Sequence, residues 1–260
     1  MRSTAKGPVK GNVLVAGAGS ALARAVAEGL AARGCGLVLA ARDEGEAART
    51  AADLALRFGV ATAALGFDAR DAVAAAALPA RAEAALPGGL GGVLVAFAVM
   101  PDQETVERDV AAIHDLVDVN VRATLVFIEA AAARLENRPG SFLCAFSSVA
   151  GDRGRRKNYA YGATKAALSA AMEGLWARLS PKRVTVLCVN AGPADGAMSW
   201  GVFPPDSPLL VSPERVARDV LSALEHRRRV VYTPWFWRPV MALLRALPAP
   251  VFRRLPIRWR

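Results

Sequence analysis

The sequence predicts a single α/β domain, Rossmann-like, built on a doubly wound parallel sheet of about seven strands and followed by an amphipathic tail. Three observations predict this fold. Short apolar runs alternate with longer segments in which apolar residues recur at helical spacing. The apolar runs show little two-residue alternation, which is typical of parallel strands buried on both faces. The 260 residues, 53% of them apolar, suffice for one domain with one sizeable core.

The apolar runs are the expected strands. They occupy residues 12–16, 37–41, 60–67, 93–98, 142–146, 184–189 and 230–232. Right-handed crossovers between them would place a ligand crevice at the carboxyl ends of the strands. Cys144 and Cys188 lie in two of the runs, and with Cys35 they are interpreted as buried thiols of a reducing compartment. Because the chain has no CxxC pair and no metal-ligand spacing, no metal site is expected.

The helix-period segments are the expected helices. They occupy residues 21–33, 44–58, 71–86, 106–135, 160–179 and 213–225. Gly34 ends the first of them, and Ser180 with Pro181 ends the fifth. Pro79 is expected to kink or break the third. The proline-rich stretch 193–213 predicts a loop over the crevice.

A glycine-rich turn follows the first strand and opens the first helix. Gly17 can make a tight turn, Gly19 lets the backbone approach a ligand, and Ser20 is the expected N-cap. Free N–H groups at a helix start can hold a pyrophosphate, helped by the helix dipole. The segment is not a full GxGxxG, so a plain strand-to-helix turn is the alternative, but its place after the first strand favours a cofactor turn. The expected cofactor contacts here are Gly17, Gly19, Ser20, Ala21 and Leu22.

The tip of the second strand bears on the choice of cofactor. An acidic residue there would bond a ribose hydroxyl and indicate NAD, whereas an arginine can pair with the 2′-phosphate of NADP. Arg42 therefore favours NADP, with NAD as the alternative because Asp43 is its neighbour. The other interpretation of this pair is a solvated arginine at a helix start with Asp43 as the N-cap.

The most specific segment joins Ser148 to a tyrosine and a lysine four residues apart. Tyr161 and Lys165 share one helix face, and a lysine cation beside a phenol favours the phenolate and lowers the tyrosine pKa. Tyr161 is then a general acid for a carbonyl or a general base for an alcohol. Tyr159 has Ala163 at the same offset and so lacks this partner. Ser148 can hydrogen-bond the substrate oxygen.

In order and spacing, the glycine turn, Asp68, Asn120, Ser148 and the Tyr161/Lys165 pair resemble the short-chain dehydrogenase/reductase family, over about residues 11–232. The resemblance implies an NAD(P)-dependent enzyme that reduces a ketone to a secondary alcohol. It implies that Lys165 also holds the nicotinamide ribose, that Asn120 supports a proton-relay water, and that Asp68 lies beside the adenine. The alternatives are a helix-bend role for Asn120 and an N-cap role for Asp68.

The chain departs from the family's pattern in three places. The two later glycines of the turn are Ala21 and Ala23. The family's Asn-Ala-Gly after the fourth strand is replaced by Ala96-Phe97-Ala98, and the segment at Gly192 lacks the threonine that would meet the carboxamide. Ala96 and Gly192 remain expected cofactor contacts by position. The catalytic set, Asn120, Ser148, Tyr161 and Lys165, is intact.

Several segments resemble a narrower branch, the reductases similar to decaprenylphosphoryl-2-keto-ribose reductase. These are residues 17–23, 149–156 and 237–257. The resemblance implies a keto-sugar on a polyprenyl phosphate, or another lipid-linked or small carbonyl compound, as substrate. The alternative function is a non-catalytic, cofactor-binding, membrane-associated scaffold of the same fold. A homo-oligomer is expected.

The tail, residues 233–260 after a domain of residues 1–232, carries most of the net charge. Residues 226–260 hold nine arginines and no acid, out of a net charge of +10. Val240, Leu243, Leu244 and Leu247 form one apolar helix face, and tryptophans interleave with the arginines. This pattern favours an anionic membrane surface over nucleic acid, because no basic stripe extends into the core. The alternative is a tail packed on its own domain or at a dimer interface.

The amino terminus is basic but lacks the apolar segment of a signal peptide, and no apolar run is long enough to span a membrane. A cytoplasmic protein is therefore expected, peripheral on the inner face of the membrane if the tail binds lipid.

Overall fold

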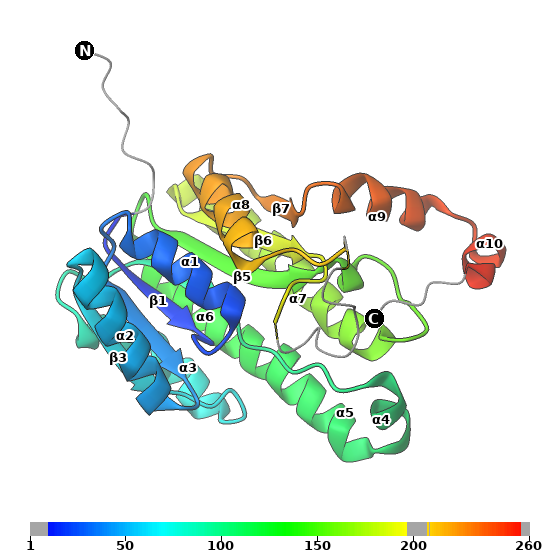
Figure 1. Cartoon of the computed structure of the whole chain (residues 1–260), viewed down its shortest axis with the longest axis horizontal. Coiled ribbons are helices and arrows are strands. Elements are labelled where there is room, and N and C mark those ends of the chain that lie inside the picture. Colours follow the sequence, from blue (N-terminus) through cyan, green and yellow to red (C-terminus); the bar gives the residue numbers. More distant parts are fainter. Residues whose placement is uncertain (1–9, 197–206, 208, 256–260) are drawn as a thin grey trace, which may run out of the picture.

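The computed structural model describes residues 10–196, 207 and 209–255. Its core is a seven-stranded parallel sheet in the order β3-β2-β1-β4-β5-β6-β7, which confirms the predicted single Rossmann-like domain (Figure 1). The strands are β1 (Asn12–Ala16), β2 (Leu37–Ala41), β3 (Thr62–Gly66), β4 (Leu90–Val95), β5 (Phe142–Ser148), β6 (Thr185–Ala191) and β7 (Val230–Thr233). The strand order reverses between β1 and β4, where doubly wound sheets bind their ligands.

Helices cover both faces of the sheet and divide the core into two layers. One layer lies under α1 (Ala21–Ala31), α2 (Glu44–Phe58) and α8 (Pro213–Glu225). The other lies under α3 (Ala72–Ala85), α6 (Thr124–Leu135) and α7 (Tyr159–Leu179). Both faces of the central strands are buried, which is why their sequences are continuous apolar runs. Cys144 in β5 and Cys188 in β6 are buried free thiols, as predicted, and Cys35 is also buried.

The predicted long helical region over 106–135 is helical except at Asp109, and it consists of four elements. They are α4 (Gln103–Arg108), α5 (Val110–Val117), the π-helical turn η1 (Asp118–Ala123) and α6. Asp109 has an extended backbone, with φ −125°, and its carboxylate accepts the Ala111 N–H at 2.9 Å, so it ends α4 and caps α5. In contrast, α3 runs through Pro79 without a break, because Pro79 is buried with Leu78 on the face that packs on the core.

Some strand boundaries also differ from the prediction. The fourth strand begins at Leu90 rather than at residue 93, since Gly92 pairs with both Val13 and Phe142 inside the sheet. It ends at Val95, so Ala96 belongs to the loop after the strand. β5 extends two residues further than predicted, and Ser148 pairs with Ala191 at the carboxyl end of the sheet.

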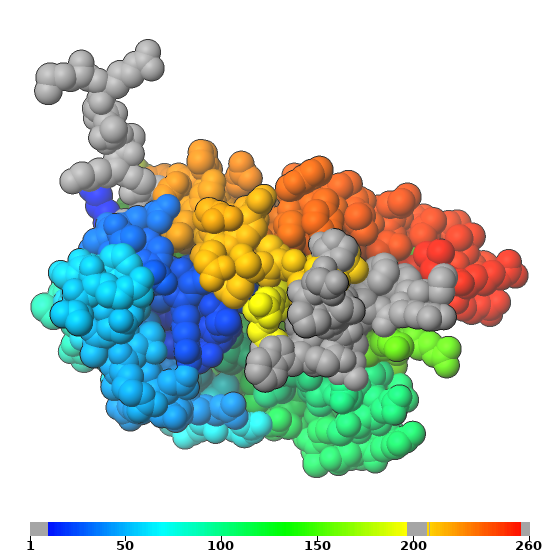
Figure 2. Space-filling model, viewed as in Figure 1, coloured from blue at the N-terminus to red at the C-terminus, as the bar shows by residue number. Residues whose placement is uncertain are grey.

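The tail after β7 begins with two helices, α9 (Trp237–Ala246) and α10 (Ala249–Arg254), at one end of the molecule (Figures 1 and 2). The predicted apolar face of α9 is correct only in part, because Leu244 is buried and Leu247 packs against the cluster that contains it. Val240 and Leu243 are 37% and 65% exposed, and the buried stripe is Trp237, Met241 and Leu244, which packs on Val149 of the domain. The stripe starts at Trp237, so the buried face is rotated from the predicted one. Arg258, Trp259 and Arg260 lie outside the described residues.

Arg153 attaches the tail to the domain. Its guanidinium donates to the main-chain oxygen of Leu244, to that of Arg245 at 3.2 Å and to that of Leu247 at 2.8 Å. It also stacks over the Phe252 ring, 3.9 Å from the centroid. A cation at the last carbonyls of a helix meets the negative end of its dipole, so Arg153 holds the carboxyl end of α9 in place. In the part of the chain described here, no helix has the length and apolarity needed to cross a bilayer.

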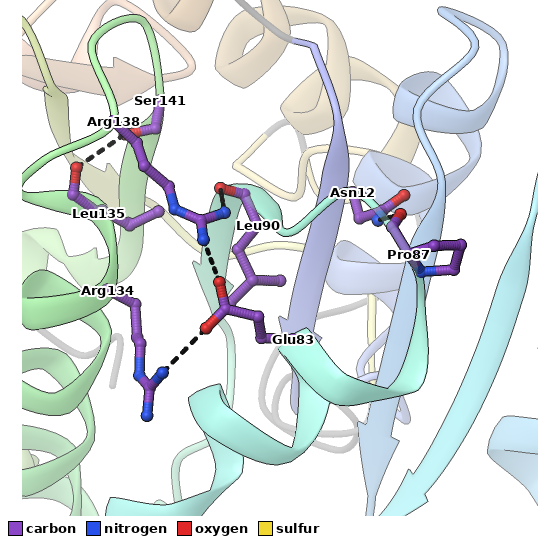
Figure 3. Close-up of polar contacts among 8 residues, drawn as sticks. All are labelled: Asn12, Glu83, Pro87, Leu90, Arg134, Leu135, Arg138 and Ser141. Atoms are coloured by element: carbon purple, nitrogen blue, oxygen red, sulfur yellow. Dashed lines mark hydrogen bonds and ion pairs between the residues drawn. The ribbon is translucent and has the colours of Figure 1, made fainter.

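Polar contacts connect α3, the segment after α6 and the starts of β1 and β4 at the amino-terminal ends of the strands (Figure 3). Arg138, just after α6, donates to the Leu90 oxygen at 3.2 Å and pairs with Glu83 of α3. Arg134 reaches the same carboxylate at 3.0 Å. Asn12 Nδ2 donates to the Pro87 oxygen at 2.8 Å. Exposed pairs of this kind each contribute about 0–1 kcal/mol, so they fix the loop before β4 more than they stabilise the fold.

Candidate active site

A cavity of about 1010 Å³ opens at the carboxyl ends of the strands. All but one of the residues predicted for the site line it. They are Gly17, Gly19, Ser20, Ala21, Leu22, Arg42, Asp68, Ala96, Ser148, Tyr161, Lys165 and Gly192. The exception is Asn120, which lies behind the cavity wall. Residues scattered over 176 positions of sequence therefore meet at one edge of the sheet because parallel strands end there together.

The glycine turn between β1 and α1 has the geometry of a close backbone approach. Gly17 has a φ of 92°, and a Cβ at this position would lie 2.5 Å from the Phe97 nitrogen, so only glycine fits. Its N–H and that of Ala18 both donate to the Ala40 oxygen, at 2.9 and 3.0 Å, which holds the turn against β2. Ser20 occupies the N-cap position of α1, as predicted, but its side chain makes no capping bond. The start of α1 therefore presents its N–H groups toward the cavity.

Two arginines flank this turn. Arg42 lines the cavity at the end of β2, while the neighbouring Asp43 caps α2 by accepting the Glu46 N–H at 2.8 Å. Arg24 of α1, which the sequence analysis missed, also lines the cavity and pairs with Glu46. Its position four residues after Ser20 places it one turn into the helix, and that spacing could have revealed it. Because Asp43 caps α2 and Glu46 is paired with Arg24, Arg42 is the arginine at this point that forms no ion pair among the described residues.

Aromatic rings form the wall next to Asp68. Phe97 contacts Phe67 and Phe127 edge to face, with ring centroids 5.3 and 5.7 Å away. Phe97 lies in the segment 96–98, which departs from the family pattern. Its ring packs against the core under the cavity. Asp68 accepts the Arg70 N–H at 3.0 Å, and the cap of α3 is Asp71 rather than Asp68, so the N-cap alternative for Asp68 is wrong.

Ser148, Tyr161 and Lys165 come together where β5 ends and α7 begins. The Ser148 hydroxyl donates to the Ala191 oxygen at 3.3 Å and accepts the Ala150 N–H at 3.1 Å. Lys165 Nζ lies 5.7 Å from the centre of the Tyr161 ring and donates to the Phe146 oxygen at 2.9 Å. The two helical residues share a face, as their spacing predicted. Tyr159, the rejected candidate, is 48% exposed and its hydroxyl is turned to Glu107 at 3.4 Å.

Burial dominates the electrostatics of this group. It raises the pKa of Tyr161, and the Ser148 hydroxyl and the Arg155 guanidinium lower that pKa by less. The predicted net lowering of the tyrosine pKa by Lys165 is therefore wrong for this structure. The lysine ammonium is held on the Phe146 carbonyl, and its own burial lowers its pKa to about 8. The Tyr161 hydroxyl is thus protonated near neutral pH.

Asn120 lies in the π-helical turn η1 and connects two walls of the site. Its Nδ2 donates to the Val99 oxygen at 2.8 Å and to the Thr164 hydroxyl at 3.2 Å, and its Oδ1 accepts the Val99 N–H at 2.8 Å. The side chain therefore joins the loop after β4 to α7, directly behind Tyr161. The π-helical turn fits the alternative of a helix-bend residue as well as a role in the site.

Two further contributors to the site were missed. Arg155 and Asn158, in the loop before α7, are buried and line the cavity beside Tyr161. The signal available was the charged run at 152–156 next to the catalytic segment. On the opposite side, the Trp237 indole of α9 packs on Gly192, so the tail forms part of the support of the cavity wall.

The fold and the side chains at this edge define a Rossmann-type oxidoreductase. A family model described as short chain dehydrogenase matches residues 11–206, so the chain belongs to the short-chain dehydrogenase family.

Curated relatives cover nearly the whole chain. An uncharacterized oxidoreductase of Mycobacterium tuberculosis is 37% identical over 244 residues, which are 94% of this chain and 96% of the relative. An uncharacterized oxidoreductase of Streptomyces coelicolor is 32% identical over 259 residues, 99% of this chain and all of the relative. Both alignments extend well past residue 232, so these relatives have a counterpart of at least part of the tail.

Solved structures share the fold. A short-chain dehydrogenase from Sphingobium yanoikuyae in complex with NADPH has a TM-score of 0.75 and 25% identity, covering 92% of this chain and 96% of that one. The bulky-bulky ketone specific alcohol dehydrogenase from Comamonas testosteroni has a TM-score of 0.76 at 22% identity, covering 94% and 98%. The second likeness concerns the fold alone.

Proposed function

We propose that this protein is an NADP(H)-dependent reductase that converts a ketone to a secondary alcohol. The observation that carries the proposal is the meeting of Ser148, Tyr161 and Lys165 in the same cavity as the glycine turn. The relative from Sphingobium yanoikuyae, whose structure is a complex with NADPH, supports the choice of cofactor.

The residues present fit a dinucleotide. The start of α1 and its glycine turn would hold the pyrophosphate, as the tight Gly17 geometry allows. Arg42, with Arg24 beside it, would take the 2′-phosphate, since the Asp43 carboxylate is engaged in capping α2. Asp68 would lie beside the adenine, and Lys165 would hold the nicotinamide ribose. Ala96 and Gly192 supply the remaining walls. When bound, the nicotinamide supplies or accepts the hydride.

The protein side chains handle the proton. Tyr161, neutral because burial raises its pKa, donates its hydroxyl proton to the carbonyl oxygen as the hydride arrives at the carbon. The Ser148 hydroxyl hydrogen-bonds the same oxygen and stabilises its developing charge. The Lys165 cation stabilises the phenolate left on Tyr161. Asn120 fixes the backbone of Val99 behind the site, and we propose that it also supports the water that returns the proton.

The test is the oxidation of NADPH by the purified full-length protein with a panel of ketones that differ in charge and size. We expect turnover with at least one ketone and none with the matching alkane. Tight binding of NADPH without turnover on any ketone would instead favour the non-catalytic scaffold.

We also propose that the outer side of the tail meets an anionic membrane, which would bring the enzyme to lipid-linked substrates at the inner face. Trp235, Leu243 and Val251 are 69%, 65% and 48% exposed, and the tail holds arginines and no acid. Each arginine near an anionic surface is worth about 1 kcal/mol before screening. Sedimentation with anionic liposomes at low salt should carry the wild-type protein down, and Leu243→Glu should leave it in solution. Equal sedimentation of both would contradict the proposal.

We propose further that the protein is a homo-oligomer. Val110, Ile113 and Val117 lie on one face of α5 and are 66%, 40% and 44% exposed, so this face lacks an apolar partner within the described chain. Light scattering of the full-length protein should give a multiple of 27.3 kDa, and Ile113→Glu should reduce it to that mass. A wild-type monomer at micromolar concentration would remove the proposal.

A further inference from the structure

Arg155 is an unusual residue for the wall of a catalytic cavity, because it is a buried cation. Its side chain is only 3% exposed, yet it lines the cavity next to Tyr161. Among the described residues, its Nε and Nη1 atoms find no hydrogen-bond partner. Burial lowers the pKa of this guanidinium to about 10, well below its ordinary value. Buried donors without acceptors destabilise a folded protein, so a purely structural role does not account for these two nitrogen atoms.

The neighbouring charges compensate the Arg155 cation only in part. Asp152 is the acid whose charge acts on it, but that carboxylate accepts the Tyr232 hydroxyl at 3.0 Å, toward β7. Asp195, across the cavity, is exposed. Arg153 is engaged with α9 and Arg156 is exposed, so of the three arginines in this loop only Arg155 faces the cavity.

A second polar group beside Arg155 also lacks a partner. Asn158 is 5% exposed and lines the same cavity, and no described residue donates to its Oδ1. The two residues are held together, since the Asn158 N–H donates to the Arg155 oxygen at 3.1 Å. The loop therefore presents one cationic donor and one acceptor, both fixed, beside the tyrosine hydroxyl that would protonate the substrate.

We propose that Arg155 binds an anionic group, a carboxylate or a phosphate, on the carbonyl substrate. This inference rests on the proposed reductase function and narrows its substrate class. The guanidinium fork matches two oxygens of either anion, and inside a buried cavity such an ion pair is strong. Asn158 Oδ1 accepts a hydroxyl or N–H of the same molecule. The substrate is thus an anionic carbonyl compound oriented by its charge, with its carbonyl at Tyr161 and Ser148.

The experiment is calorimetric titration of the full-length protein, with and without saturating NADP⁺, so that no turnover occurs. Three ligands share one ring: benzoylformate carries a carboxylate, phenyl phosphate carries a phosphate, and methyl benzoylformate is neutral. The proteins are wild type, Arg155→Gln and the matched control Arg156→Gln. We expect wild type and the control to bind at least one anion, and Arg155→Gln to bind it about tenfold to a hundredfold more weakly. The ester should bind all three proteins alike.

Comparing the affinities for benzoylformate and phenyl phosphate shows whether the site prefers a carboxylate or a phosphate. Arg155→Gln should also raise the melting temperature, because it removes a buried charge with two unsatisfied donors, whereas loss of a structural arginine would lower it. NADP⁺ should bind all three proteins equally.

The proposal is overturned if neither anion binds wild type, if Arg155→Gln binds both as wild type does, or if it loses NADP⁺ instead. Should Arg155→Gln fail to fold, Arg155→Lys, which keeps the charge but loses the fork, must still bind the preferred anion more weakly than the control. Binding of anions with no ketone turnover would contradict the reductase function while leaving this site intact.

Discussion

The Trp237 indole occupies the space that a side chain at Gly192 would need. A Cβ built on Gly192 would lie 2.0 Å from the indole nitrogen and 2.5 Å from Cδ1. Gly192 follows β6 and lines the cavity, whereas Trp237 begins the tail helix α9 and is 2% exposed. The first helix of the tail is therefore part of the support of the site, whatever its outer side contacts.

Trp237→Ala is expected to destabilise the domain by about 3–5 kcal/mol, because it leaves a large cavity against Val149 and Gly192. Urea denaturation followed by circular dichroism measures the change. Trp235→Ala is the matched control: that ring is 69% exposed, and its loss should change the free energy of unfolding by less than about 0.5 kcal/mol. Equal effects of the two substitutions would mean that α9 does not pack as described.

Tyr161→Phe is expected to reduce ketone turnover by at least about 10²–10⁴-fold, since it removes the proposed proton donor. NADPH binding, followed by fluorescence, should be nearly unchanged. The matched control is Tyr159→Phe, two residues earlier and exposed, which should keep wild-type activity. An inactive Tyr159→Phe beside an active Tyr161→Phe would reverse the assignment.

The rate of reduction should fall as the pH rises through about 8. Burial lowers the pKa of Lys165 to about 8, and only the cationic form stabilises the phenolate that forms on Tyr161. The loss therefore occurs on the alkaline side, where an ordinary lysine would still be charged. The measurement is kcat/KM for a ketone at saturating NADPH between pH 6 and about 10. A profile that stays flat up to the pKa of a free lysine would contradict this effect of burial.

Arg42→Ala should weaken NADPH binding about tenfold, the value of one lost charge-assisted contact, and leave NADH binding unchanged. Calorimetric titration of both cofactors into both proteins measures this. Arg24→Ala should have a smaller effect in the same direction, because Arg24 is already paired with Glu46. If wild type binds the two cofactors equally, the preference for NADP does not reside at the tip of β2.

Four elements were predicted to the residue, namely β1, β2, α2 and α8. The two strands are continuous apolar runs, and the two helices have local capping signals: Asp43 and Gly59 bound α2, and Ser212 with Pro213 starts α8. The proximity of Tyr161 and Lys165 was predictable because four-residue spacing on a helix fixes it. In contrast, the break at Asp109 and the rotation of α9 depend on what each helix packs against, which periodicity alone does not contain.

Arg155 and Arg24 were missed for a related reason, because the sequence signals that they carry are weak. In sequence, an arginine that lines a cavity looks the same as a solvated arginine in a charged run. Only the fold shows which arginine of the run faces the cavity. The direction of the Tyr161 pKa also depends on burial, and burial opposed the effect of Lys165 that the spacing suggested.

The loop at residues 152–158 contacts both the tail and the cavity. Arg153 of this loop donates hydrogen bonds at the carboxyl end of α9, and Arg155, two residues later, lines the cavity. Any compound that binds the cavity more tightly when α9 is docked must, by reciprocity, strengthen the docking of α9 by the same factor. For such a compound, binding in the cavity and docking of α9 are coupled. A change in the docking of α9 would then change the affinity of the cavity, and binding in the cavity would change the docking of α9.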